Sequence, residues 1–391
     1  MSKHFYHVLK LFYHITFINT NMLTNLRPIA TIIFAGNVSR NVWKQNPAMG
    51  VYLGEVYMTI KDIAKLSGVA VSTVSRVINN HPDVSSEARE KVLRVIAEYN
   101  FVPNNSARDL VKTKSDAIGL IVRGSQNTFY TDIIHAIEFT LDKAGYTMVM
   151  RQIGSNDDEI TCGAMMQREK RLLGIIFLGG RSDYSPGELN VITVPYVFCT
   201  YNNCYGTLPA DSYSSVSISD EDEAMKAVEK LISHGHKKIA ALVSATDDRL
   251  ISQLRYQGYV AALKKHGIEV SDDLVIRCGS FNIKDAYLAT KAKLLKKQSF
   301  TAVFAIADNM AIGAMKALRE AGLTIPDDCS IIGIDGIEVS EYVDPVLSTL
   351  CQPMAEMGTK SAEQIIGLIE ETGTNSQILL HTTFREGASI K

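Results

Sequence analysis

The sequence has no long apolar run, few cysteines and none of the common catalytic motifs. No 18 consecutive apolar residues occur, so no membrane-spanning helix is predicted. The six cysteines are scattered without a CxxC pair, which argues against a zinc site or a disulfide framework and favours a reducing cytoplasm. GxSxG, HExxH, the P-loop and GxGxxG after a strand are also missing. We therefore expect no membrane association, no metal or cofactor, and no enzyme activity.

Positive charge gathers toward the amino terminus, although the net charge of the 391 residues is only −2. Residues 1–57 carry five Lys and Arg against one acid, and residues 58–114 carry nine against six, which leaves −9 for residues 115–391. The length exceeds that of one ordinary domain, so two or three domains are expected. A small basic head before a large acidic body is typical of a polyanion-binding domain joined to a domain with a different task.

Residues 1–57 are aromatic and weakly patterned, and they contain the only tryptophan, Trp43. They lack the order of a basic start, an apolar run and a small-residue cleavage site that marks a secretory signal. Residues 53–55 can be encoded by a ribosome-binding sequence at a suitable distance before Met58. We expect 1–57 to be a non-native or disordered extension and Met58 to be the natural start, which amino-terminal sequencing of the native protein tests.

Three short helices are predicted after residue 57, each with apolar residues on one face. Thr59 and Asp62 have the spacing of a capping box at the start of the first helix, and Gly68 allows the left-handed turn that ends it. The second helix is predicted over 72–79 and the third over 85–99. Two short helices around a glycine turn can present the start of a helix to the major groove of DNA. From spacing alone, a three-helix bundle without a DNA role remains the alternative.

The amino-acid sequence of this head is a more specific signal than the spacing of its apolar residues. TIKDIAKLSGVAVSTVSRVINN (59–80) and VSSEAREKVLRVIAEYNFVPN (84–104) resemble the LacI/GalR family of bacterial regulators. The resemblance implies a helix-turn-helix DNA-binding domain over 58–103 that contacts operator DNA as half of a homodimer. The implied DNA contacts are base edges for Val71, Ser72 and Arg76, and phosphates for Thr73, Ser75 and Asn79. Ala70 departs from the family, which usually has a serine there, so one phosphate contact is expected to be weakened.

A short polar segment, 104–116, separates the head from the body, and a helix of this length is marginal in water. The resemblance implies a hinge helix that orders on operator DNA and pairs with its dimer mate. In that role Ala107 allows close approach of the two hinges and Arg108 lies beside the groove. Leu110 wedges into the minor groove and kinks the duplex. Without the resemblance, a flexible linker would be the favoured interpretation.

Beyond residue 116, short apolar runs alternate with amphipathic stretches. The strand-like runs are 117–122, 146–151, 173–179, 194–199, 238–244, 301–307 and 330–335. Buried strands with helices between them predict parallel sheets covered on both faces. There are too many strands for one compact sheet, so we predict an α/β fold of two doubly wound lobes over 117–391, preceded by the all-α head. A ligand is expected in the cleft between the lobes, beyond the carboxyl ends of the strands.

Family-like phrases continue through the body, so the resemblance covers all but the extension and implies a periplasmic-binding-protein-like core that also dimerises. They are GHKKIA (235–240), RYQGYVAAL (255–263), AIADNMAIGAMKAL (305–318), IIGIDG (331–336) and PVLSTLCQP (345–353). The resemblance implies effector contacts from Arg255 and Asp335, with the ring of Phe129 near the cleft. Ala307 stands where the family usually has asparagine, and Thr200 where some members have aspartate, so the ligand can differ from a standard sugar. The alternatives are a solvated helix residue for Arg255, a turn residue for Asp335 and a core residue for Phe129.

Together these features predict a cytoplasmic homodimer that binds double-stranded operator DNA and acts as a repressor under the control of a carbohydrate-like small molecule. An exported or anchored sugar-binding protein would explain the body, but neither the head nor the missing signal sequence. A doubly wound enzyme would lack any catalytic constellation. The sequence names neither the effector nor the operator, and it leaves open whether the oligomer is larger than a dimer. It also leaves open whether the effector releases or strengthens DNA binding.

Replacing Leu110 with alanine is expected to weaken specific operator binding far more than non-specific DNA binding, because only the kinked operator complex uses the wedge. Fluorescence anisotropy with an operator duplex and with a scrambled duplex measures the two affinities. An equal loss for both duplexes would contradict the wedge.

Overall fold

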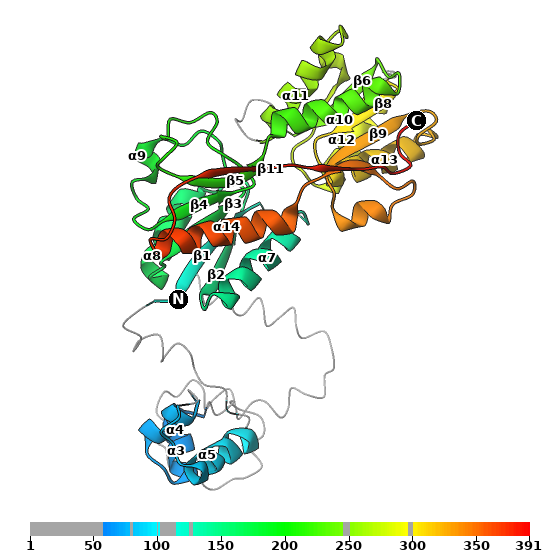
Figure 1. Ribbon diagram of the computed structural model, residues 1–391. Coiled ribbons are helices and arrows are strands. Elements are labelled where there is room, and N and C mark those ends of the chain that lie inside the picture. Colours follow the sequence, from blue (N-terminus) through cyan, green and yellow to red (C-terminus); the bar gives the residue numbers. More distant parts are fainter. Residues whose placement is uncertain are drawn as a thin grey trace, which may run out of the picture. The chain divides into compact units, whose positions relative to one another are not determined.

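The computed structural model describes residues 58–78, 81–99, 101, 115–124, 128–244, 251–295 and 300–391. The chain divides into two compact units, Met1–Val111 and Lys112–Lys391, which contain the predicted head and the predicted body (Figure 1). The expectation for residues 1–57 lies outside the described residues. Four predicted DNA contacts also lie outside them and stay predictions: Asn79, Ala107, Arg108 and Leu110.

The head consists of three helices around a small apolar core: α3 (Ile60–Ser67), α4 (Val71–Ile78) and α5 (Ser86–Glu98). The predicted capping box is present, because the Thr59 amide donates to Asp62 Oδ2 at 2.9 Å and the Thr59 hydroxyl accepts from the Asp62 amide at 3.4 Å. Gly68 has a φ of 69° and ends α3, as predicted. Helix α4 begins one residue earlier than predicted. The core consists of Ile63, Ala64, Val74, Val77, Val92, Val95 and Phe101.

The body contains two six-stranded sheets, which confirms the prediction of two doubly wound lobes. The first-lobe sheet, with the order β11-β5-β4-β3-β1-β2, is parallel throughout. Its strands are β1 (Ala117–Arg123), β2 (Thr147–Ile153), β3 (Gly174–Leu178), β4 (Tyr196–Cys199), β5 (Ser214–Ile218) and β11 (Gln377–Leu380). The second-lobe sheet has the order β12-β10-β9-β8-β6-β7, and only β12 runs antiparallel to its neighbour. Its strands are β6 (Ile239–Val243), β7 (Val275–Arg277), β8 (Ala302–Ala305), β9 (Ser330–Asp335), β10 (Ser348–Cys351) and β12 (Thr383–Arg385).

Helices cover both faces of the first sheet. The first-lobe helices are α7 (Tyr130–Lys143), α8 (Glu159–Lys170), α9 (Pro186–Leu189) and α14 (Met354–Ile369). Because side chains alternate along a strand, Leu120 of β1 packs in one apolar cluster with Ile137 of α7 and Met357 of α14. The next residue, Ile121, packs in a separate cluster with Ile160 of α8. This alternation is the pattern expected of a doubly wound lobe.

The second-lobe helices pack in two pairs, α10 with α11 and α12 with α13. Their bounds are α10 (Asp220–Ser233), α11 (Ile251–Lys265), α12 (Ile283–Leu295) and α13 (Asp308–Glu320), with short 3-10 turns η3 (Asp272–Leu274) and η4 (Glu338–Glu341). Gly258 of α11 allows the first pair to approach closely, because a Cβ there would collide with the carbonyl of Glu221. No helix in the described part of the chain has both the length and the apolar character needed to cross a bilayer.

The chain passes between the two lobes three times: from β5 into α10, from β10 into α14, and from β11 into β12 (Figure 1). Direct contacts also join the lobes. The Tyr205 hydroxyl donates to Gln257 Oε1 at 2.9 Å, and Ile251 at the start of α11 packs against a first-lobe apolar cluster. Crossing segments of this kind are where hinge motions between lobes are absorbed.

Candidate DNA-recognition helix and effector cleft

Helix α4 buries one face in the head and exposes the predicted DNA contacts on the other. Val74 and Val77 are buried in the core of the head. The exposed or half-buried side chains of the helix include Val71, Ser72, Thr73, Ser75 and Arg76. Because residues four apart lie on one face of a helix, Ser72 and Arg76 share a side. The helix therefore presents a polar, positively charged face that its core residues hold in place.

Arg255 is buried in the second lobe, with only 3% of its surface exposed, so it does not fit the alternative of a solvated helix residue. Its Nε donates to Asp220 Oδ1 at 2.8 Å, and its Nη1 donates to Asp335 Oδ1 at 3.3 Å and to the carbonyl of Ile306. Gln352 Nε2 donates to the same Asp335 oxygen at 2.8 Å. The two predicted effector residues Arg255 and Asp335 thus meet in one polar cluster at the carboxyl ends of β8 and β9.

A further carboxylate, that of Asp308, lies behind this cluster. Its Oδ2 accepts from the amides of Gly336 and Ile337 at 2.8 and 3.1 Å, and its Oδ1 accepts from the Thr349 hydroxyl at 2.6 Å. Asp308 thereby shapes the turn that follows β9. The sequence contains a signal for Asp308, because an acid directly follows the strand-like run ending at Ala307. Its structural role was not predictable, because that role depends on a contact with β10.

Two carboxyl groups, those of Asp220 and Asp335, face the single guanidinium of Arg255. Burial raises the pKa of Asp335 to about 7; Arg255 opposes this rise and the charge of Asp308 adds to it. Burial likewise raises the pKa of Asp220, again against the effect of Arg255. The two raised pKa values favour a proton on this pair of carboxyl groups.

Two strand ends, one in each lobe, have strained backbone. Thr200, directly after β4, has a φ of 75°, and Asp335, at the end of β9, has a φ of 132°. Residues other than glycine rarely adopt these values, at a cost of about 1–3 kcal/mol each. The Thr200 hydroxyl is also buried and has no hydrogen-bond partner among the described residues. Strain and an unpaired polar group at the ends of strands are typical of a ligand site.

The structure differs from the prediction that the ring of Phe129 lies near a ligand. Phe129 is 5% exposed and belongs to the first-lobe apolar core, which fits the core alternative. The half-buried Tyr130 beside it carries the polar group, and its hydroxyl lies against Gly179 at the end of β3. Burial raises the pKa of Tyr130 to about 12, and the charge of Asp335 in the other lobe adds to this. Tyr130 therefore lies on the side of the first lobe that is near Asp335, and the sequence did not predict a role for it.

Ala307 is 3% exposed and packs in the second-lobe core at the start of α13, so it offers no polar group to a ligand. No group of three or more His, Cys, Asp and Glu side chains within the described ranges could hold a metal ion. Polar groups from both lobes come close here, because the charges of Arg255 and Asp335 act on the Tyr130 hydroxyl of the first lobe. Gln352 joins them through its hydrogen bond to Asp335.

The stability of the protein is expected to fall as pH rises through the titration of Asp335. Its folded pKa, about 7, exceeds its ordinary value of 3.8, so the folded protein binds the proton more tightly than the unfolded chain. That advantage is complete below pH about 4 and is lost as pH rises to about 7. Thermal unfolding of the wild type and of Asp335→Asn, which cannot titrate there, measures the difference. A constant difference between the two proteins over this range would refute the assignment.

Comparison with known proteins agrees with both units. The family model "Bacterial regulatory proteins, lacI family" matches residues 59–104, and the model "Periplasmic binding protein-like domain" matches residues 228–390. The HTH-type transcriptional regulator MalR of Clostridium butyricum is 40% identical over 84% of this chain and 98% of its own length. The ribose operon repressor of Haemophilus influenzae is 33% identical over 82% of this chain and 95% of its own length.

Solved structures give the same result. The transcriptional regulator CelR in complex with cellobiose matches with a TM-score of 0.63 and 29% identity, over 85% of this chain and 99% of its own. The lac repressor dimer bound to operator and the anti-inducer ONPF matches with a TM-score of 0.67 and 26% identity, over 85% and 98%. With a DNA-binding head, a two-lobed body and full-length relatives of this identity, the chain belongs to the LacI family of bacterial regulatory proteins.

Proposed function

We propose that this transcription regulator is a repressor that binds operator DNA as a homodimer through α4, and that a neutral carbohydrate in the cleft of its body controls binding. The proposed DNA binding rests on one observation, the exposed face of α4. Ser72 and Arg76 lie on this face, and Val74 and Val77 are buried in the core of the head on the other. Arginine can bond guanine in the major groove, and short polar side chains can bond phosphates. Because operator DNA lies in the cytoplasm, the proposal places the protein there.

A dimer is proposed because one short helix reads too few bases for specific recognition in a genome. The lac repressor structure similar to this chain is a dimer on its operator. The hinge prediction for 104–116 fits the same arrangement, since each short hinge helix would need its mate to be stable. The alternative of an exported sugar-binding protein is not supported, because it leaves the match of residues 59–104 without a role.

The charge of the cleft favours an uncharged effector. Each arginine near the strand ends of the described residues is paired with at least one carboxylate. The pairs are Arg123 with Glu159, Arg181 with Asp183 and Glu188, and Arg255 with Asp220 and Asp335. A phosphate or carboxylate would therefore meet no excess of positive charge, whereas sugar hydroxyls can both donate to carboxylates and accept from arginines. Relatives with bound sugars exist, namely CelR with cellobiose and an Enterococcus faecium regulator with ribose.

Control of DNA binding follows from the way the lobes are joined. A ligand that contacts Arg255 and Asp335 in one lobe and Tyr130 in the other would favour one arrangement of the lobes over another. The three crossing segments would absorb the movement, and the first lobe would pass it to the hinge that precedes β1. Whether the sugar releases or strengthens operator binding depends on which arrangement it prefers.

Arg76→Gln is expected to weaken binding to a palindromic operator, selected from random duplexes, by about tenfold to a hundredfold, since one base-contacting arginine is worth about 1–3 kcal/mol. Anisotropy titrations at several salt concentrations measure operator and scrambled DNA in parallel. Lys91→Gln is the matched control, because it removes the same charge from α5, where Lys91 is 52% exposed and paired with Glu87. A similar loss in both variants would argue against base reading by α4.

A panel of sugars tests the effector class. We expect at least one neutral mono- or disaccharide, with cellobiose, maltose and ribose included, to raise the melting temperature of the full chain and to change operator affinity. The corresponding sugar 6-phosphates and uronic acids are expected to have no effect, because the arginines are already neutralised. Stabilisation by the phosphates alone would overturn the proposed effector class.

A further inference from the structure

The first-lobe sheet has a second edge, the amino edge, where its parallel strands begin and which lies opposite to their carboxyl ends. Strands β1 and β3 both begin there, because Ile118 and Gly174 are register partners in a parallel pair. The Leu173 amide donates to the Ala117 carbonyl at 2.8 Å, so the chain that leaves α8 meets the start of β1. Ala117 directly follows the predicted hinge segment 104–116. The amino edge is therefore the part of the body at which the chain from the DNA-binding head enters.

Helix α8 ends at the amino edge with an excess of positive charge. Its last turn and the residue after it carry three exposed cations, Arg168, Lys170 and Arg171, which we call the amino-edge cations. The acid among them, Glu169, is engaged by Arg151 of β2 at 3.1 Å. No carboxylate in the described part of the chain pairs with any of the three. Their charge is therefore left to solvent or to a partner molecule.

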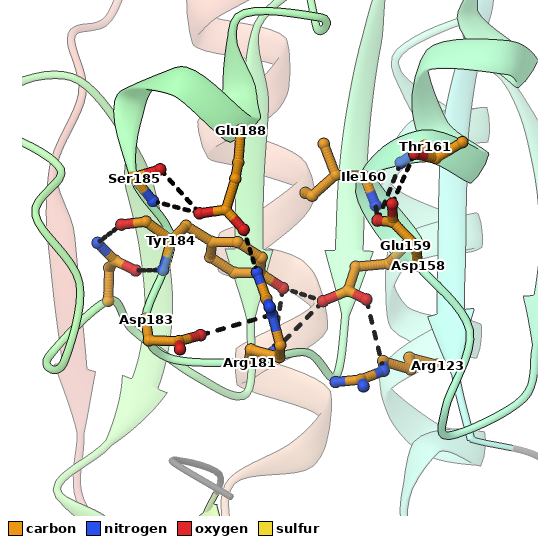
Figure 2. A network of polar contacts seen from close by, with 11 residues as sticks. Arg123, Asp158, Glu159, Ile160, Thr161, Arg181, Asp183, Tyr184, Ser185 and Glu188 are labelled. Atoms are coloured by element: carbon orange, nitrogen blue, oxygen red, sulfur yellow. Dashed lines mark hydrogen bonds and ion pairs between the residues drawn. The ribbon is translucent and has the colours of Figure 1, made fainter.

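The arginines at the other end of α8 differ from the amino-edge cations in this respect. Figure 2 shows Arg123, the last residue of β1, beside the carboxylate of Glu159, with 3.4 Å between its Nε and the nearer oxygen. It also shows Arg181 paired with Asp183 and Glu188. At one edge of the lobe the fold thus neutralises its arginines, and at the other it does not. A cluster of unneutralised cations attracts a partner of the opposite charge.

Helix α8 is anchored at both ends, so the amino-edge cations extend from a fixed support. Asp158 caps the start of the helix by accepting from the amides of Ile160 and Thr161 (Figure 2). After the end of the helix, Leu172 is buried against β1, where a Cβ on Gly119 would collide with it. A fixed support reduces the entropy that a charged side chain loses when it binds a partner.

The excess of positive charge is local to α8. Helix α7 ends at the same edge with Asp142 beside Lys143, and α14 is followed there by the acids Glu370 and Glu371. The body as a whole carries a net charge of −9, so three clustered cations are not an average property of its surface. A local basic cluster on an acidic body indicates a specific anionic partner rather than general attraction to polyanions.

DNA is the polyanion that the proposed function brings close to the amino edge. In the predicted operator complex Leu110 lies in the minor groove, and Ala117 follows it by seven residues. An extended chain covers about 3.5 Å per residue, so the start of β1 stays within about 25 Å of the groove. Over that distance the duplex carries one phosphate charge per about 1.7 Å of its axis. Lys112 and Lys114 lie between these two points in the sequence and add positive charge.

We propose that the amino edge of the first lobe is a second DNA-contacting surface, on which Arg168, Lys170 and Arg171 bind backbone phosphates of the operator. This inference rests on the proposed operator binding and makes the body, as well as the head, a source of affinity. Phosphate contacts position a protein on the duplex without reading its sequence. The surface occurs twice in a homodimer, so a movement of the first lobes changes phosphate contacts directly.

The test measures the operator affinity of the full chain by fluorescence anisotropy over a range of salt concentrations. The triple variant Arg168→Gln, Lys170→Gln, Arg171→Gln is expected to bind about tenfold more weakly at low salt. The slope of log affinity against log salt is expected to become shallower by about 2 or more, because each lost phosphate contact removes about 0.9. Operator and scrambled duplexes are expected to lose affinity by similar factors, since phosphates carry no sequence information.

The matched control removes three cations from the second lobe, in the variant Lys237→Gln, Lys238→Gln, Lys264→Gln. These lysines are also exposed and have no carboxylate partner in the described ranges. The control changes the net charge by the same amount and is expected to bind both duplexes as the wild type does. An equal loss in the two triple variants would assign the effect to net charge and rule out a contact at the amino edge.

Arg171→Gly separates DNA contact from stability. Arg171 ends α8 with a φ of 52°, a left-handed value that glycine adopts more readily than arginine. The variant is therefore expected to melt no lower than the wild type, while its operator affinity falls about threefold or more. It also serves as the test if the triple variant does not fold. A lower melting temperature with unchanged DNA affinity would show that Arg171 serves only the helix end and would contradict the proposal.

The outcomes distinguish this inference from the function on which it rests. If the wild type binds an operator and the amino-edge triple variant keeps its affinity and its full salt slope, the second surface is overturned while operator binding stands. If sedimentation equilibrium shows that the triple variant no longer dimerises as the wild type does, the cations belong to assembly and the inference is likewise overturned. If the wild type binds no duplex, the proposed function fails, and the amino-edge surface fails with it.

Discussion

The common direction of the strands is the constraint on which the rest of the body depends. All strands of the first sheet and five of the six in the second run parallel, so each sheet collects its strand ends at one edge. Backbone amides and carbonyls at that edge no longer pair within the sheet, and polar side chains gather there. Arg123, Thr200 and Asp335 occupy such positions although they are far apart in the sequence. The positions of these polar side chains thus follow from the parallel order of the strands.

Burial then decides how the charges at these edges are arranged. A guanidinium taken out of water needs carboxylates and hydrogen bonds around it, which Arg255 finds in Asp220 and Asp335 and Arg123 finds in Glu159. The two lobes solve this problem differently. In the second lobe two carboxyl groups share one guanidinium and the pKa of Asp335 is raised, whereas in the first lobe the carboxylate of Glu159 also accepts from a tyrosine hydroxyl.

Much of the fold could be predicted from the sequence, because its signals are local. The capping box at Thr59, the turn at Gly68 and the seven apolar runs depend on neighbours within a few residues. Strand β5 was not predictable in this way, since its sequence SSVSI is polar by composition yet all five residues are buried. Strands β7, β10, β11 and β12, of three or four residues each, were too short to show a period.

The candidate site was predictable only where family phrases mark it. Arg255 and Asp335, for which the resemblance implies effector contacts, lie in one polar cluster, whereas Phe129 lies in the core and Ala307 offers no polar group. The partners Asp220 and Glu159 carried no signal, because each begins a helix and an acid at a helix start is ordinarily a solvated or capping residue. Only the packing of α8 against β1 and of α10 against α11 turns these two acids into buried partners of arginines.

Control of DNA binding by a ligand depends on how the two DNA-binding heads of a dimer are arranged. Helix α4 packs on a small core within the head itself, which holds the shape of its exposed face. What a ligand can change is the spacing and pairing of two such heads, because recognition by a dimer requires two helices at a set distance. In the proposed control, the lobes would move about the three crossing segments, and β1 of the first lobe begins at Ala117, directly after the predicted hinge segment 104–116. The proposed control of DNA binding therefore requires ligand contacts in both lobes, because a ligand held by one lobe alone would not favour one arrangement of the lobes over another.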